Sequence, residues 1–286
     1  MSALCMVHEV SRQAYYQYWE REERKVLCED LVISLVMPIR HIMPMIGVRK
    51  LHSKLSSNLA KINGGIGRDM LFTILRKHDL LVRPTHRYVR TTNSMHRFRK
   101  YKNLIKDFKV VRTNQVWVVD ITYLRLVERF CYLALLTDLF SRKIVGYDVS
   151  DSLELSGAIR ALCNALKATR EQRVDLQTIH HSDRAIQYCS PRYTDIIFAN
   201  HMQVSMTEEN HVYENSVAER VNGILKREFL LEREFAEVKQ ASKACHEAIE
   251  TYNHDRPHLS LDMLTPNQVY DGSVFQRNIN MMCVNN

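Results

Sequence analysis

Three acidic residues of the 286-residue chain lie in sequence surroundings that suit metal-bound carboxylates. Asp120 lies inside the apolar run VWVVDITYL, Asp183 ends the run LQTIHHSD, and Glu219 belongs to the helix-like stretch ENSVAERVNGILKREF. A carboxylate on a buried strand is costly unless it is paired or bound to a metal. Mg²⁺ prefers oxygen ligands, and a pair of ions activates an attacking oxygen and stabilises a leaving oxygen. The three acids therefore indicate phosphodiester chemistry with two Mg²⁺ ions, for which Mn²⁺ is a possible substitute.

Each acid also has a simpler interpretation. Asp120 would suit the solvated face of an edge strand, Asp183 a turn, and Glu219 a solvated helix face. Asp138, in LLTDLFSRK, is interpreted as a structural turn residue. His181 is assigned an orienting or phosphate-contacting role, because a metal that lowers the pKa of the nucleophile leaves no need for a histidine base.

The stretch around Glu219 predicts a helix with one chemically distinctive face. At about 100° per residue, that face carries an amide, a carboxylate, a bare backbone and an ammonium group. These groups come from Asn215, Glu219, Gly223 and Lys226. Gly223 would allow close approach of DNA and Lys226 would contact a phosphate. The residues expected to pack on a sheet instead are Val217, Val221, Ile224 and Leu225.

The charge of the chain is divided unevenly. Residues 1–113 carry 22 Lys and Arg against 9 Asp and Glu, a net charge of +13, whereas residues 114–286 carry 18 against 23, a net charge of −5. A basic front joined to an acidic back predicts a module that binds a polyanion, attached to one that needs carboxylates. Basic residues that merely solvate helices are the alternative.

Composition indicates the cellular compartment of the protein and the redox state of its cysteines. Hydrophobic residues make up 45% of the chain and charged residues 25%, as in ordinary globular proteins. No apolar run approaches the roughly 20 residues that span a bilayer, and the first residues lack a signal-peptide pattern. We therefore expect no membrane association and a cytoplasmic protein. The seven cysteines are scattered, without C-x-x-C spacing, and are interpreted as buried reduced thiols.

The first 112 residues are expected to be helical and basic. Residues 1–38 predict a helical segment. Residues 39–82 predict two short helices around a glycine-containing break, which resemble a DNA-binding helix-turn-helix with Arg49 and Lys50 as DNA contacts. Any small basic helical pair would show the same pattern.

Residues 83–112 form a basic linker with ten Lys and Arg and one acid. An arm that lies along phosphates, with contacts from Arg97, Arg99 and Lys100, and a solvated linker are both consistent with this composition.

From residue 114 the pattern changes to strands. Three strands are expected at Val116–Leu126, Phe130–Leu139 and Ile144–Val149, as an antiparallel meander. The later segments predict helix 153–169, strand 177–181, helix 191–200, strand 202–206, and helices 215–234 and 236–253. This order predicts an α/β fold with a mixed sheet.

Five segments resemble the orfB product of bacterial insertion sequences that encode an orfA/orfB pair. They are NQVWVVDITYL, YLALLTDLFSRKIVGYDVS, HHSDRAIQYCS, SMTEENHVYENSVAERVNGILKREF and YNHDRPHLSLDMLTPNQVY. These are DDE transposases of the retroviral-integrase superfamily. The resemblance implies an RNase H-like catalytic core with a mixed five-stranded sheet over residues 113–272, followed by a tail at 273–286.

The same resemblance implies roles for particular residues and partners. Asp120, Asp183 and Glu219 would bind the metal ions, and Asn215 and Lys226 would assist near the DNA end. The expected reaction is cleavage at the terminal inverted repeats and strand transfer to target DNA. An orfA-type partner or fusion and a homo-oligomer on DNA are expected.

Two departures from the family pattern have structural consequences. Ala185 stands where glycine is usual, and would be strained if that position needs a positive φ. Asn210 and Glu214 also replace the usual glycine and aspartate.

Two other functions stay open at this stage. One is a catalytically silent DNA-binding protein or regulator of the element. The other is an RNase H-like nuclease that acts on RNA·DNA hybrids.

Overall fold

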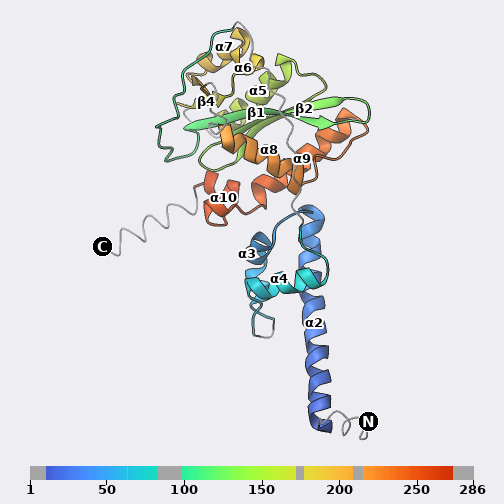
Figure 1. Cartoon of the computed structure of the whole chain (residues 1–286). Coiled ribbons are helices and arrows are strands. Elements are labelled where there is room, and N and C mark those ends of the chain that lie inside the picture. The colour runs from blue at the N-terminus through green and yellow to red at the C-terminus, as the bar shows by residue number, and fades with distance from the viewer. Residues whose placement is uncertain (1–10, 63, 83–97, 172–176, 209–214, 273–286) are drawn as a thin grey trace, which may run out of the picture. The chain divides into compact units, whose positions relative to one another are not determined.

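A computed structural model describes residues 11–62, 64–82, 98–171, 177–208 and 215–272, with only the backbone of 170 and 171. The chain divides into two compact units, Met1–Pro84 and Thr85–Asn286 (Figure 1). Each unit is considered by itself below. The finer division into five segments expected from the sequence remains a prediction.

The first unit is built from helices in its described residues. They are α2 (Arg12–Ile42), α3 (Val48–Leu59) and α4 (Arg68–Lys77). The side chain of Ser11 caps α2 by accepting a hydrogen bond from the Ala14 amide at 3.0 Å. The two short helices expected after residue 39 are confirmed as α3 and α4. The first helix extends past the expected end at residue 38, while residues 1–10 lie outside the described part.

A small apolar core holds the three helices together. It includes Val32 and Val36 of α2, Leu51 of α3, and Leu71 and Leu75 of α4. The turn between α3 and α4 contains Gly64 and Gly65, whose φ angles of 83° and 79° are reached easily only by glycine. An ion pair between Glu29 of α2 and Lys77 of α4, with Nζ at 2.8 Å from Oε2, adds a polar contact.

The second unit contains a five-stranded mixed sheet in the order β3-β2-β1-β4-β5. The strands are β1 (Val116–Arg125), β2 (Phe130–Asp138), β3 (Ile144–Ser150), β4 (Ile179–Ser182) and β5 (Gln203–Met206). The first three pair antiparallel, whereas β4 and β5 run parallel to β1. The expected meander and the mixed five-stranded sheet are therefore confirmed.

The strand register places two of the predicted site residues beside each other in the sheet. In the parallel pair, Val119 of β1 lies opposite Ser182 of β4. The next residues along the two strands are Asp120 and Asp183. Since side chains alternate between the faces of a strand, both carboxylates are expected on the same face, at the end of β4.

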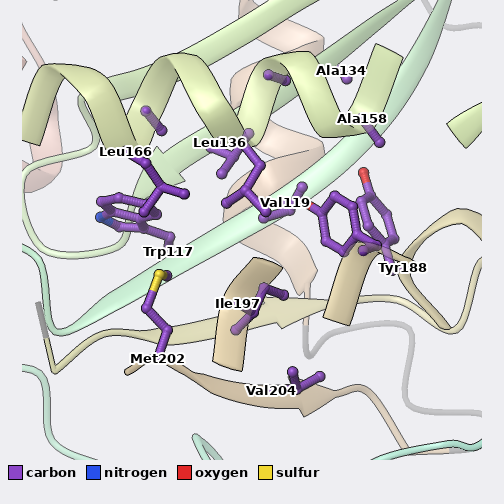
Figure 2. Packing of buried hydrophobic residues seen from close by; sticks show 14 of the residues in the cluster. Trp117, Val119, Ala134, Leu136, Ala158, Leu166, Tyr188, Ile197, Met202 and Val204 are labelled. Atoms are coloured by element: carbon purple, nitrogen blue, oxygen red, sulfur yellow. The ribbon is translucent and has the colours of Figure 1, made fainter. Parts of the chain in front are cut away.

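Helices cover both faces of the sheet (Figure 1). They are α5 (Leu155–Glu171), α6 (Ile186–Cys189), α7 (Pro191–Ala199), α8 (Ser216–Glu228), α9 (Val238–His254) and α10 (Pro266–Tyr270), with a 3₁₀ turn at Leu259–Leu261. On one face, Trp117 and Val119 of β1 pack in a cluster with Leu166 of α5 and Ile197 of α7 (Figure 2). On the other face, α8 and α9 pack against β1, β2 and β3. Among the described residues, no helix is both long and apolar enough to cross a membrane.

The described part of the basic linker packs on the second unit. The Tyr101 ring lies 6.1 Å from that of Phe198, and the Leu104 amide donates to Ser205 Oγ at 2.8 Å. Ile105 and Val110 pack beside β1 and β4. From residue 98 onward this segment is therefore not a free solvated linker.

One helix is shorter than expected. The sequence predicts helix from 215 to 234, but α8 ends at Glu228 and Leu230 adopts a φ of 57°. This turn lets Leu231 and Phe235, both 1% exposed, pack into the core beneath α8 and α9. Burial of two large apolar side chains outweighs the local helical pattern.

Candidate active site

Asp120 lies on the face of β1 that α8 covers. Its Oδ2 accepts a hydrogen bond from Asn222 Nδ2 at 2.7 Å, and its Oδ1 accepts one from the Ile121 amide at 3.0 Å. Burial and the negative charge of Asp183 raise the pKa of Asp120 to about 7, with a smaller contribution from Glu219. The carboxylate therefore sits in surroundings that disfavour its charged form unless a cation is present.

Asp183 follows β4 at the carboxyl end of the strand. Its Oδ1 accepts a hydrogen bond from the Ala185 amide at 3.1 Å. Ala185 has φ −67° and ψ 146°, an extended conformation that suits any residue. The strain considered for alanine at this position is therefore absent. Asn210 and Glu214, the other departures, lie outside the described residues.

Glu219 lies in the first turn of α8 and its side chain is exposed. Partial burial raises the pKa of its carboxyl. Its charge is one of those that raise the pKa of Asp120, so the two side chains interact electrostatically. Within the described ranges, however, no three His, Cys, Asp or Glu side chains lie close enough to hold a metal ion as they stand.

The predicted chemical face of α8 borders these acids. Asn215 occupies the N-cap position of α8 and is 6% exposed, and its Nδ2 donates to the Val119 carbonyl of β1 at 3.1 Å. Lys226 Nζ lies 4.2 Å from the centre of the Tyr123 ring, and burial lowers its pKa. A Cβ added to Gly223 would meet only Arg227 Nη2, at 3.5 Å. Asn215 therefore fixes α8 to β1, while Gly223 and Lys226 are partly exposed.

Asn222 is a site residue that the sequence did not reveal. It is 6% exposed, on the buried side of α8, and its amide is the side-chain partner of Asp120. Its neighbours Val221, Ile224 and Leu225 are apolar and buried, so the pattern predicted packing at this position. The available signal was a polar amide on an otherwise apolar helix face.

Comparison with known proteins identifies the family of the chain. A family model described as the integrase core domain matches residues 111–211, and a second of the same description matches residues 200–266. The chain is 33% identical over 269 residues to the insertion element IS600 uncharacterized 31 kDa protein of Shigella sonnei. The aligned region covers 92% of this chain and 96% of that protein. The chain belongs to the insertion-sequence transposases of the retroviral-integrase superfamily. It is a DNA transposase with an RNase H-like core.

Further similarities cover the catalytic region. The transposase for insertion sequence element IS629 of Shigella sonnei is 32% identical over 59% of this chain and 55% of that protein. Among solved structures, the HTLV-2 integrase catalytic core domain in complex with magnesium is 17% identical, with a TM-score of 0.44, over 57% of this chain and 99% of that chain. Family membership makes this transposase a polynucleotidyl transferase.

Two residues expected to contact DNA in this transposase are buried. His181 is completely buried in β4, where its Nδ1 lies 2.8 Å from Ser205 Oγ. Lys50 is 8% exposed on α3. Their burial leaves little side-chain surface for a DNA contact, and the two assignments remain predictions. The sequence pattern missed this because it does not report which side of a short strand or helix faces the core.

Three further predicted DNA contacts are exposed cations, and a fourth lies outside the described residues. Arg49, Arg99 and Lys100 are exposed, and the Arg99 guanidinium lies 5.2 Å from the centre of the Tyr101 ring. Arg97 lies outside the described residues. The exposed cations are available to a polyanion, and their role remains a prediction.

Asp138 has the structural role that its sequence context predicted. It is completely buried, and its carboxylate accepts hydrogen bonds from the Ser141 amide and the Asn114 amide, both at 2.7 Å. The first bond closes the β2–β3 turn, in which Arg142 has a φ of 65°, and the second attaches that turn to the residues before β1. Asp138 therefore stabilises a turn and does not belong to the acidic site.

The donor chemistry of the acidic site fits a hard divalent cation. Asp120 lies in the middle of β1, beside the end of β4 that Asp183 follows, and the two carboxylates repel each other. Oxygen donors of this kind suit Mg²⁺ or Mn²⁺, whereas thiolate or imidazole ligands would be expected for zinc. The five described cysteines, Cys28, Cys131, Cys163, Cys189 and Cys245, are free thiols.

Proposed function

We propose that this transposase cleaves the ends of its insertion sequence and transfers the strands to target DNA, with Asp120, Asp183 and Glu219 as ligands of two divalent metal ions. The observation that carries the proposal is the adjacency of Asp120 and Asp183 on β1 and β4, with a pKa of about 7 for Asp120. Mutual repulsion of this kind is relieved when a cation binds between the carboxylates.

The protein groups around the acids have separate roles in this proposal. Asp120 and Asp183 would hold the metal, and Glu219 would complete the set from the first turn of α8. Mg²⁺ or Mn²⁺, when bound, would activate the attacking oxygen and stabilise the leaving oxygen. Asn222 orients the Asp120 carboxylate through the 2.7 Å hydrogen bond. Lys226, beside Tyr123, would meet a phosphate of the bound DNA.

The DNA would be held by both units. The net charge of +13 over residues 1–113 supports a role for this basic segment, including the α3–α4 pair, in binding the terminal inverted repeats. Exposed Arg49 and Arg99 are candidate phosphate contacts. An orfA-type partner or fusion and an oligomer assembled on DNA belong to the same proposal.

The proposal is tested by joining assays with DNA that carries the element's ends. Full-length wild type, Asp120→Asn, Asp183→Asn and Glu219→Gln are compared in Mg²⁺ and in Mn²⁺, with any orfA partner present. We expect wild-type cleavage and joining that each substitution abolishes while DNA binding persists. Binding without any cleavage by the wild type would favour a silent DNA-binding protein, and cleavage of RNA·DNA hybrids alone would favour a nuclease.

A further inference from the structure

The end of α8 is attached to the segment after α9 by a buried ion pair. Arg256 Nε and Nη2 donate to Glu228 Oε2 and Oε1, each at 2.8 Å. Arg256 is 2% exposed, and the Glu228 side chain is 19% exposed. The parallel pair of charge-assisted bonds fixes the direction as well as the distance between the two side chains.

The arginine side of this pair is itself fixed to the sheet. Tyr252 Oη donates to the Arg142 carbonyl in the β2–β3 turn at 2.9 Å. Asn253 accepts from the Ile144 amide at 2.9 Å and donates to the Ile144 carbonyl at 3.0 Å, at the start of β3. The Arg256 guanidinium lies 5.8 Å from the centre of the Tyr252 ring. Arg256 therefore lies just after the end of α9, which is bound to two points of the sheet.

Stability alone is a weak explanation for the pair. Removing two charges from water offsets most of their attraction, and apolar side chains of similar size often stabilise a core equally well. A bidentate pair instead specifies one orientation of the helix that carries it. The helix in question is α8, which carries Glu219 in its first turn and Asn222 beside Asp120.

Hydrogen bonds hold α8 on both sides of these residues. Asn215, at the start of the helix, donates to the Val119 carbonyl of β1, and Glu228, at its end, accepts from Arg256. Glu219 and Asn222 lie between the two attachments. Glu228 is nine residues beyond Glu219, about 13 Å along a helix axis. A rotation or shift of α8 would therefore move both residues relative to Asp120.

We propose that Arg256 and Glu228 are positioning residues, whose ion pair sets the placement of α8 and thereby of Glu219 and Asn222 at the acidic site. The inference rests on the proposed function for the role of Glu219 as a metal ligand. The claim that the ion pair fixes the position of α8 does not depend on that function.

The test compares Glu228→Gln and Arg256→Lys with Asp148→Asn in the full-length protein. Asp148→Asn is the matched control, because it breaks another bidentate pair, in which Arg160 of α5 donates to Asp148 of β3, and leaves the α8 contacts intact. Hydrogen exchange of residues 216–228 reports the fixing of α8 without metal. The Mn²⁺ concentration that gives half of the metal-induced rise in Tm reports the acidic site without activity.

We expect Glu228→Gln to speed exchange in α8 and to raise the half-maximal Mn²⁺ concentration roughly tenfold, in the range seen for residues that orient metal ligands. Arg256→Lys keeps the positive charge but cannot donate the two parallel hydrogen bonds of the guanidinium, so it should give a smaller effect of the same kind. Asp148→Asn should cause neither change. Equal effects from Glu228→Gln and Asp148→Asn, or no change in α8 exchange, would overturn the inference. A wild type without a Mn²⁺ response would contradict the proposed metal site, and α8 exchange would still decide the role of the ion pair.

Discussion

Asn222 of α8 donates a hydrogen bond from Nδ2 to Oδ2 of Asp120 on β1, at 2.7 Å. This bond connects the helix that carries Glu219 to the strand that carries the first acid. It stabilises the charged form of Asp120 against the effects of burial and of Asp183, which both raise its pKa. The amide therefore has an electrostatic role as well as an orienting one.

Replacing Asn222 by Ala should weaken the acidic site without removing an acid. Loss of the donor leaves Asp120 with a still higher pKa, so its carboxylate is charged only at higher pH. We expect DNA cleavage in Mg²⁺ to fall by roughly 10- to 100-fold, with the pH profile displaced to higher pH. The measurement is the initial rate of end cleavage from pH 6 to pH 9.

Asn164→Ala is the control for that substitution. Asn164 also donates to an oxygen, the Tyr147 carbonyl at 3.1 Å, but it lies on α5 away from the acids. Its replacement should leave the pH profile unchanged. An Asn222→Ala enzyme with the wild-type profile would show that the amide does not act on Asp120.

The metal-free protein should become more stable at neutral pH when Asp120 cannot ionise. The pKa of Asp120 in the folded protein is about 7, above the ordinary value of 3.8, so the folded state holds this proton more tightly than the unfolded chain does. Stability is therefore lost as pH rises from about 4 to 7. We expect Asp120→Asn to exceed wild type by about 1–3 kcal/mol at pH 8 in a chelator, and by much less at pH 4.

Urea unfolding at a series of pH values measures this difference. His180, whose pKa is lowered to about 3 by burial, costs stability as pH falls below its ordinary value of 6.5. That effect is common to both proteins and cancels in the comparison. A metal-free Asp120→Asn protein that is less stable than wild type at pH 8 would contradict the electrostatic account.

Much of the sheet was predictable from the sequence because its strands are rich in β-branched and aromatic residues and are bounded by turns. The placement of Asp120 and Asp183 on neighbouring strands follows from that pattern once the order of the sheet is known. The pairing of β1 with β4 is not written in any local segment. It depends on contacts between residues about 60 positions apart, as in Val116 opposite Ile179.

The sequence was least informative where burial decides the outcome. Lys50 and His181, which are predicted as DNA contacts, are both buried. The 215–234 helix was expected to continue, and it stops at Glu228 because Leu231 and Phe235 are buried beyond it. Arg256 and Asn222 carry polar contacts inside the core, which an apolar periodicity cannot reveal. For Asn222 the local sign was a polar residue on an apolar helix face, whereas Arg256 lies in the polar run YNHDRPH and gave no such sign.

Gly146 should not tolerate a side chain. A Cβ at this position of β3 would lie 2.5 Å from the Ala161 carbonyl oxygen and 2.6 Å from Ala165 Cβ, so α5 would have to move away from the sheet. We expect Gly146→Ala to lower the free energy of unfolding by about 1–3 kcal/mol, as for other overpacked cores.

Gly223→Ala is the matched control for that experiment, since its Cβ would meet only Arg227 Nη2 at 3.5 Å. Alanine inside a helix is favoured over glycine by roughly 0.5–1 kcal/mol, so this variant should be as stable as wild type or more so. Urea unfolding of both variants gives the comparison. Equal losses at the two positions would rule out close packing of α5 on β3 as the cause.

Ala185→Gly should bring no benefit. The φ of −67° at Ala185 needs no glycine, so no strain is relieved. Glycine gives the unfolded chain more freedom, and we expect a loss of about 0.4–1 kcal/mol in stability. Cleavage should stay within twofold of wild type, which is the order of ordinary surface changes. Higher Tm or clearly faster cleavage in Ala185→Gly would mean that the alanine restrains the Asp183 loop.

The most direct test of the metal-ligand assignment replaces Asp183 by Cys. A sulfur ligand suits Mg²⁺ poorly and is accepted better by a softer ion such as Mn²⁺. Cleavage and joining of DNA ends by Asp183→Cys are measured in Mg²⁺ and in Mn²⁺, with Asp195→Cys, at an exposed aspartate of α7, as a control outside the site. Activity of Asp183→Cys that is absent in Mg²⁺ and restored in Mn²⁺ is the expected result. Wild-type activity of Asp183→Cys in Mg²⁺ would contradict the assignment of Asp183, with Asp120 and Glu219, as a ligand of the catalytic metal.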